Sequence, residues 1–145
     1  MTESLGMKLG KCARRLHSVM DNATGGEVSA QQLRILGYLT RKGGYAVQKD
    51  IEQNFRLSRP AVSQILDHMV ENGLVNREVS KGDRRSRLVT LTDEGKLLSK
   101  STYEKICNLE KKFFSVLSEE EKKVLVNSLD KIYKALEEYS DKTSC

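Results

Sequence analysis

The apolar residues of this chain recur mostly at three- and four-residue steps, the spacing of amphipathic helices. One such stripe begins at Leu5 and continues to the glycine pair at residues 25 and 26. A second follows Ser29, which forms a capping-box sequence with Gln32, and stops at the glycines of residues 43 and 44. A short helix is expected over residues 48–54. The first third of the chain is therefore predicted to be helical.

The next segment predicts a helix followed by a β-hairpin. Ser58 is a suitable N-cap and Pro60 is tolerated in a first turn, so a helix is expected from there to about residue 72. After Gly73 the apolar period changes from 3.6 to 2, which predicts two strands over residues 74–79 and 87–92, joined by a loop of residues 80–86. The apolar stripe of the helix is Val62, Ile65, Leu66, Met69 and Val70.

Two long amphipathic helices are expected in the rest of the chain, one capped by Thr92 and one by a capping box of Ser118 and Glu121. The predicted fold is mainly α with a small two- to three-stranded β wing, a winged helix-turn-helix with long dimerisation helices at both termini. We expect an N-terminal dimerisation helix (1–28), a winged helix-turn-helix DNA-binding region (29–95) and C-terminal dimerisation helices (96–145), in one compact protomer. The terminal stripes favour a homodimer, and an intramolecular bundle is the alternative.

The positive charge is concentrated in the middle of the chain. Of the formal net charge of +5, residues 30–92 carry all the surplus, with eleven basic and six acidic residues. Lys81, Arg84, Arg85 and Arg87 lie within seven residues of one another. Such a cluster suits a polyanion, because each cation placed on a phosphate releases counterions. A solvated loop is the alternative.

Composition narrows the class of protein further. The chain has 145 residues and three cysteines, Cys12, Cys107 and Cys145, none in a CxxC pair, which fits a reducing compartment. No apolar run is long enough to span a membrane and no signal sequence is evident, so a cytoplasmic protein without a membrane is expected. No enzyme motif, cofactor loop or metal-ligand spacing is present, so neither an enzyme nor a cofactor nor a metal site is expected.

The order of the predicted elements points to double-stranded DNA. A helix fits the major groove and reads base edges near its amino end, while a cationic loop reaches the minor groove. Arg59 suits guanine or phosphate, Gln64 suits adenine, and short hydroxyls suit backbone oxygens. The candidate contacts on this helix are Ser58, Arg59, Pro60, Ala61, Ser63, Gln64 and His68.

Two stretches resemble the MarR family of bacterial transcriptional regulators: residues 62–77, VSQILDHMVENGLVNR, and residues 82–95, GDRRSRLVTLTDEG. The resemblance implies a homodimeric regulator of palindromic DNA, commonly a repressor, released by a small phenolic or lipophilic effector or by cysteine oxidation. It makes Asp83 the residue that orients an arginine and Arg85 the arginine that enters the minor groove, with Arg84 and Arg87 as phosphate or support residues. The sequence departs from the family at Glu52, usually Ala, and at Arg56, a glycine-like turn position.

The resemblance also suggests where an effector binds. The family's pocket lies between the dimer helices and the winged domain, which makes Arg14, Arg15, His17 and Tyr38 candidate effector-binding residues. Cys12 is a candidate redox sensor, although its place on an apolar stripe favours inert packing. A winged-helix adaptor that binds proteins and not DNA is the remaining alternative.

Overall fold

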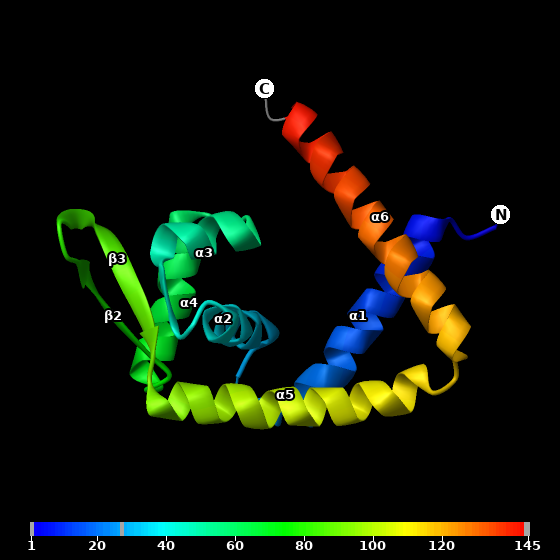
Figure 1. The fold of residues 1–145 in the computed structure, drawn as a ribbon, viewed down its shortest axis with the longest axis horizontal. Helices are drawn as coiled ribbons and strands as arrows, with labels where there is room; N and C mark the ends of the chain where they lie inside the picture. Colours follow the sequence, from blue (N-terminus) through cyan, green and yellow to red (C-terminus); the bar gives the residue numbers. More distant parts are fainter. Residues whose placement is uncertain (1, 27, 144–145) are drawn as a thin grey trace. The chain divides into compact units, whose positions relative to one another are not determined.

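A computed structural model describes residues 2–26 and 28–143. The chain divides into two compact units, Met1–Ile106 and Cys107–Cys145, and each is described by itself. The elements are α1 (Leu5–Ala23), α2 (Ala30–Arg41), β1 (Tyr45–Val47), α3 (Gln48–Phe55), α4 (Arg59–Glu71), β2 (Val75–Ser80), β3 (Asp83–Leu91), α5 (Asp93–Phe114) and α6 (Glu119–Thr143) (Figure 1). This order confirms the mainly helical fold with a small β wing.

Helices α2, α4, α5 and α6 begin at the capping residues that the sequence predicts for them. Ser29 and Gln32 form the complete capping box of α2. The Ser118 N–H donates to Glu121 Oε1 at 3.1 Å, and the Glu121 N–H donates to Ser118 Oγ at 3.2 Å, which caps α6 in the same way. The helix α3 ends at Arg56, whose φ of 52° is left-handed. Arg56 thus adopts the backbone conformation for which glycine is the usual choice.

The three strands form one antiparallel sheet in the order β1-β3-β2. The prediction of a seven-residue loop between the wing strands is wrong, because β3 begins at Asp83 and leaves Lys81 and Gly82 as the turn. Gly82 has a φ of +87°, which lets the chain reverse over so short a distance. The third strand, β1, pairs Ala46 with Val89. Its position had not been predicted from the sequence.

The core of the first unit lies between α2, α3, α4 and the sheet. On α4 the buried positions are Val62, Leu66 and Met69, each 0% exposed. Val70 was predicted to share this stripe, but it is 41% exposed. The buried stripe is narrower than the apolar stripe because it follows positions i, i+4 and i+7, and Val70 lies at its edge.

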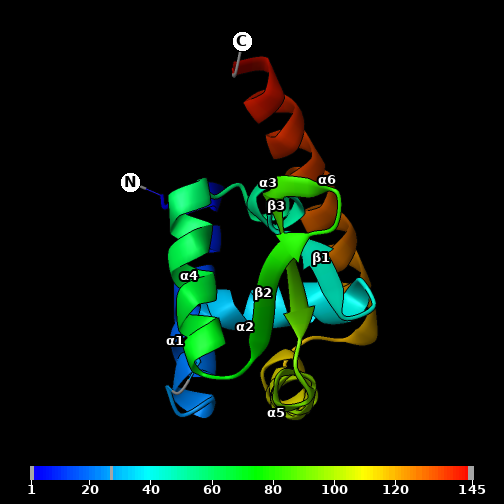
Figure 2. The same ribbon diagram turned by 90° about the vertical axis from the view of Figure 1, so that its left-hand side faces the viewer.

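The amino-terminal end of α4 and the tip of the β2–β3 wing lie at the same end of the first unit (Figures 1 and 2). A tight turn at Gly73 joins α4 to β2, so the helix and the strand run in opposite directions and their far ends lie at the same end of the unit. The opposite end of the hairpin leads directly into α5. The two elements predicted to contact DNA therefore face one side.

Several helices expose much of their apolar stripe. In α1 no residue is buried, and Leu5 is 75% exposed. On α6 of the second unit, Leu136 is 61% and Leu129 39% exposed. None of the helices in the described residues has the length and hydropathy that a membrane span requires. The exposed apolar side chains of α1 and α6 are available to pack against another surface.

Candidate nucleic-acid interface

The first turn of α4 is fixed by its own cap. Ser58 has an extended backbone and its hydroxyl oxygen accepts a hydrogen bond from the Ala61 N–H at 3.2 Å. Pro60 follows in the first turn, where its missing N–H breaks no helical hydrogen bond. The Ser58 hydroxyl therefore stabilises the first turn of α4, in addition to any contact with DNA.

The exposed face of α4 carries most of the residues proposed to read DNA. Arg59, Pro60, Gln64 and His68 are exposed, and Ala61 is half-buried. Gln64 and His68 are four residues apart and lie on one face. His68 Nδ1 lies 3.8 Å from a carboxylate oxygen of Glu71 in the last turn. An amide near the amino end, preceded by a guanidinium, is suited to hydrogen bonding with base edges and phosphates.

Ser63 differs from the other candidates because it faces inward. Its hydroxyl oxygen accepts hydrogen bonds from Gln48 Nε2 and from Arg77 NH2, both at 3.0 Å. Arg77 also pairs with Asp67 Oδ1 at 2.6 Å. Sequence reasoning gave no role to Gln48 or Arg77. In the sequence, Gln48 is only a glutamine at the start of α3 and Arg77 only an arginine at the root of the wing. Neither position indicates which side chain it contacts.

The wing tip presents arginines on a constrained backbone. Asp83 Oδ1 accepts a hydrogen bond from the Arg85 backbone N–H at 2.9 Å. The resemblance suggested that this carboxylate holds a guanidinium, whereas the contact that the structure shows is with the main chain. Arg87 NH1 donates to the Arg84 carbonyl oxygen at 3.0 Å. Asp83 and Arg87 thus shape the tip, and the side chains of Arg84 and Arg85 are exposed on it.

The candidate effector residues lie in different environments. Arg14, Arg15 and His17 are exposed on α1. Tyr38 is buried on α2, where its ring contacts Phe55 edge-on at a centroid distance of 5.7 Å. The contacts found for Tyr38 in the described part of the chain thus place it in the core of the first unit, whereas the other three are exposed on α1.

Cys12 is also on α1 and is exposed in the single chain, as is most of the α1 apolar stripe, so its expected inert packing stays a prediction. Cys107 is half-buried, and Cys145 lies outside the described residues.

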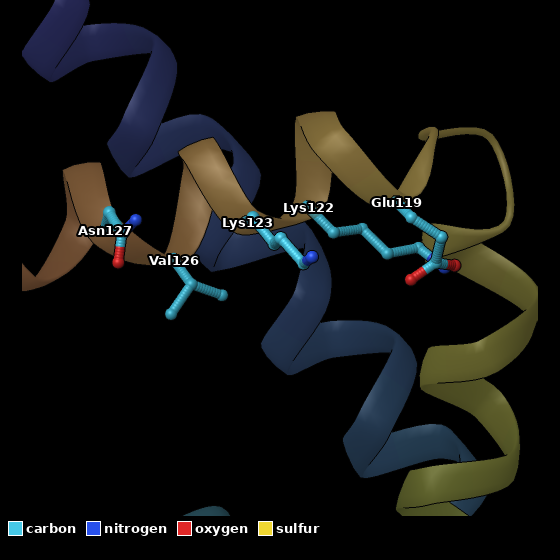
Figure 3. Close-up of a pocket in the computed structure, with 5 residues that line it drawn as sticks. All are labelled: Glu119, Lys122, Lys123, Val126 and Asn127. Atoms are coloured by element: carbon cyan, nitrogen blue, oxygen red, sulfur yellow. The ribbon is translucent and has the colours of Figure 1, made fainter.

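A hollow on the second unit is lined by one side of α6 (Figure 3). Its lining side chains include Lys122, whose Nζ lies 3.0 Å from Glu119 Oε1. A phenolic ligand needs apolar walls that enclose most of its surface. This hollow offers an exposed ion pair on a single helix, so it does not fit such a ligand. Its lining residues are Glu119, Lys122, Lys123, Val126 and Asn127.

The helix pair α3–α4 followed by the β2–β3 wing defines a winged helix-turn-helix, a DNA-binding fold. The family model of the MarR family matches residues 27–86. The HTH-type transcriptional regulator YfiV of Bacillus subtilis is 32% identical over 111 residues, which cover 77% of this chain and 69% of that protein. The chain belongs to the MarR family of transcriptional regulators.

Solved structures share the fold at lower identity. The C80S mutant of MarR from E. coli has a TM-score of 0.76 and 19% identity, over 92% of this chain and 98% of that one. The organohalide-sensing regulator RdhR-CbdbA1625, in its 2,4-dichlorophenol-bound form, has a TM-score of 0.83 and 17% identity, over 90% of this chain and 78% of that one. Both confirm the MarR-type winged-helix architecture.

Proposed function

We propose that this transcriptional regulator acts as a homodimer that binds palindromic double-stranded DNA, with α4 in the major groove and the wing in the minor groove. The observation that carries the proposal is that the amino end of α4 and the wing tip lie at one end of the first unit (Figure 2). Exposed Arg59 and Gln64 on α4 and exposed Arg84 and Arg85 on the wing therefore present cations and a base-reading amide on one side.

The proposed division of labour assigns phosphate and groove contacts to the wing and base readout to α4. The Asp83 contact to the Arg85 main chain reduces the backbone freedom that the tip would lose on docking. Gln64 lies within the first two turns of α4, and residues near the amino end of such a helix reach base edges. Arg85 should then contribute to affinity for many sequences, and Gln64 to preference at one base position.

A salt titration of fluorescent duplexes tests this proposal. The preferred duplex is first selected from random DNA, and affinity is then measured over a range of salt concentrations. Arg85→Ala should weaken binding to all duplexes and reduce the salt slope by about 1. Lys100→Ala removes the same charge from an exposed position on α5, the helix that follows the root of the wing, and should leave the slope unchanged.

A second variant tests whether Gln64 reads a base. Gln64→Ala should relax preference at one position by about 1–3 kcal/mol and leave the salt slope as it was. Equal losses on every sequence for Gln64→Ala and Arg85→Ala would contradict the division of labour. Binding that is absent, or that ignores salt, would contradict DNA binding altogether and favour an adaptor that contacts proteins.

The homodimer is supported by the apolar surface that α1 and α6 leave exposed. A two-fold dimer presents two copies of α4 related by symmetry, which is why a palindromic site is proposed. Sedimentation equilibrium at micromolar concentration should give twice the mass of one chain. Leu129→Glu places a charge on the α6 stripe and should shift the equilibrium toward single chains, whereas a wild-type chain that sediments alone would contradict the proposal.

We also propose that a small aromatic effector releases the protein from DNA and that the protein is a repressor. RdhR-CbdbA1625, which shares this fold, is described as organohalide-sensing and was crystallised with 2,4-dichlorophenol. A panel of chlorinated and hydroxylated aromatic compounds should include one that lowers DNA affinity at equilibrium. Cys12→Ser is the control, because release by such a compound should persist in it.

A further inference from the structure

Three elements of the first unit meet at one hydroxyl group. Ser63 on α4 accepts hydrogen bonds from Gln48 at the start of α3 and from Arg77 on β2, each at 3.0 Å. Ser63 and Asp67 are one helical turn apart, and Arg77 contacts both, through NH2 and NH1 respectively. One guanidinium thus spans two successive turns of α4. We call Gln48, Ser63, Asp67 and Arg77 the α4 clamp.

The clamp connects α4 to the wing. Arg77 is paired with Val89 in the sheet, and Val89 is 0% exposed, so the backbone of Arg77 is held by the core of the unit. Its planar guanidinium donates in two fixed directions, and an ammonium group cannot reproduce that geometry. Arg77 therefore connects β2 to two turns of α4, beside the apolar contacts that α4 makes in the core.

The clamp contains two buried polar atoms that lack a hydrogen-bond partner in the described part of the chain. Gln48 is 4% exposed, and its Oε1 atom is buried without a hydrogen-bond partner among the described residues, as is Arg77 Nε. A buried polar group without a partner destabilises the fold, and an apolar cluster of similar volume would avoid this. Polar side chains at this position are thus poorly explained by stability alone. They are explained if their directional contacts define a geometry.

We propose that Arg77 is a positioning residue that holds α4 at a fixed angle to the wing, so that Gln64 and Arg85 engage DNA together. This inference rests on the proposed function. Arg77 is itself directed at α4, with a side chain only 20% exposed, and it is not counted among the residues that touch DNA. Its effect on DNA recognition is transmitted through Ser63 and Asp67.

The first test does not need DNA. Arg77→Met keeps an unbranched, mostly apolar stem, which is shorter than that of arginine, and removes both hydrogen bonds. Arg34→Met is the matched control, because Arg34 Nε donates to the Ala30 carbonyl of its own helix. Amide hydrogen exchange should become faster across α4 in Arg77→Met, with α2 unaffected, since α4 would lose its lateral restraint. Unchanged exchange in α4, or an equal increase in every helix, would overturn the inference.

The second test measures discrimination. The affinity for the selected duplex is divided by the affinity for the same duplex with the Gln64-dependent base pair replaced. Arg77→Met should lower this ratio about tenfold, within the range that one base contact supplies, and leave the salt slope unchanged. A residue that only stabilises the fold would lower both affinities equally. Arg77→Lys, which retains a charge for Asp67 but cannot also reach Ser63, should fall between wild type and Arg77→Met.

The two failures are distinguishable. If the wild-type chain binds no duplex while exchange in α4 responds to Arg77→Met, the proposed function fails and the clamp remains as a structural device without a reading role, which contradicts this inference. If the wild-type chain binds DNA and the discrimination ratio of Arg77→Met equals that of wild type, the proposed function stands and the inference alone is overturned.

Discussion

Gly95 lies where the first turn of α5 meets the backbone that joins α4 to β2. A Cβ atom added at Gly95 would lie 2.1 Å from the Leu74 carbonyl oxygen and 3.1 Å from its carbon. The same oxygen accepts a hydrogen bond from the Thr92 N–H at 3.1 Å, and the Gly95 N–H donates to Thr92 Oγ1 at 3.0 Å. Gly95→Ala therefore forces main-chain atoms apart, because no flexible side chain can yield.

The magnitude follows from this geometry. Ordinary van der Waals contact begins near 3.4 Å, so the separation from Leu74 must increase by about 1.3 Å from its 2.1 Å. Such overpacking costs about 1–3 kcal/mol, and loss of the Thr92 hydrogen bond costs about 1 kcal/mol more. Alanine regains about 1 kcal/mol through its better helix propensity. We expect a net destabilisation of about 1–3 kcal/mol.

Urea unfolding followed by circular dichroism measures this difference, and it is repeated at several protein concentrations because dimerisation would add to the apparent stability. Gly37→Ala in α2 is the matched control. Its added Cβ meets the flexible end of Arg41 at 3.3 Å, so it should be neutral or stabilise by up to about 1 kcal/mol. A Gly95→Ala protein as stable as wild type would refute the close-packing argument.

Two further predictions concern the core and the cap of α6. Leu66→Ala should destabilise the protein by about 2–5 kcal/mol, because Leu66 is 0% exposed, whereas Val70→Ala at a 41% exposed position should cost far less; equal losses in urea unfolding would contradict the assigned orientation of α4. The hydrogen bonds that Glu121 makes with Ser118, first to its backbone and then to its side chain, lower the pKa of Glu121 below its ordinary 4.5. Because the pKa of Glu121 is lower in the folded state, its ionised carboxylate stabilises the fold at pH values above its ordinary pKa. This contribution is lost as the pH falls through the folded-state pKa. Glu121→Gln should remove that part of the pH dependence of unfolding, and an unchanged profile would count against the cap.

Local chemistry explains why the helix starts could be predicted. The caps at Ser29, Ser58, Thr92 and Ser118 satisfy backbone groups within three residues, so the signal is contained in a short stretch of sequence. Strand limits depend on pairing partners elsewhere in the chain. The three-residue β1 carries too few positions to show alternation, and its pairing with β3 defines it.

The candidate interface also has one part that local sequence could predict and one part that it could not. Exposed residues on α4 could be inferred from helical periodicity, which separates Gln64 from Leu66. The α4 clamp could not, because Gln48 and Arg77 approach Ser63 from sequence distances of 15 and 14 residues. The contact of Asp83 with the Arg85 main chain follows from its short carboxylate, which reaches the N–H two residues along, as in an Asx turn, and its orienting of an arginine side chain stays a prediction.

The central place of β3 in the sheet determines how the wing can move. At its root, Val89 and Leu91 are buried between neighbouring strands, while Arg84 and Arg85 at the tip are exposed. The hairpin is therefore fixed at its root by the core, and any displacement of the hairpin is largest at its tip. In the proposed complex with DNA, a displacement of the tip would therefore leave the buried side chains at the root in place.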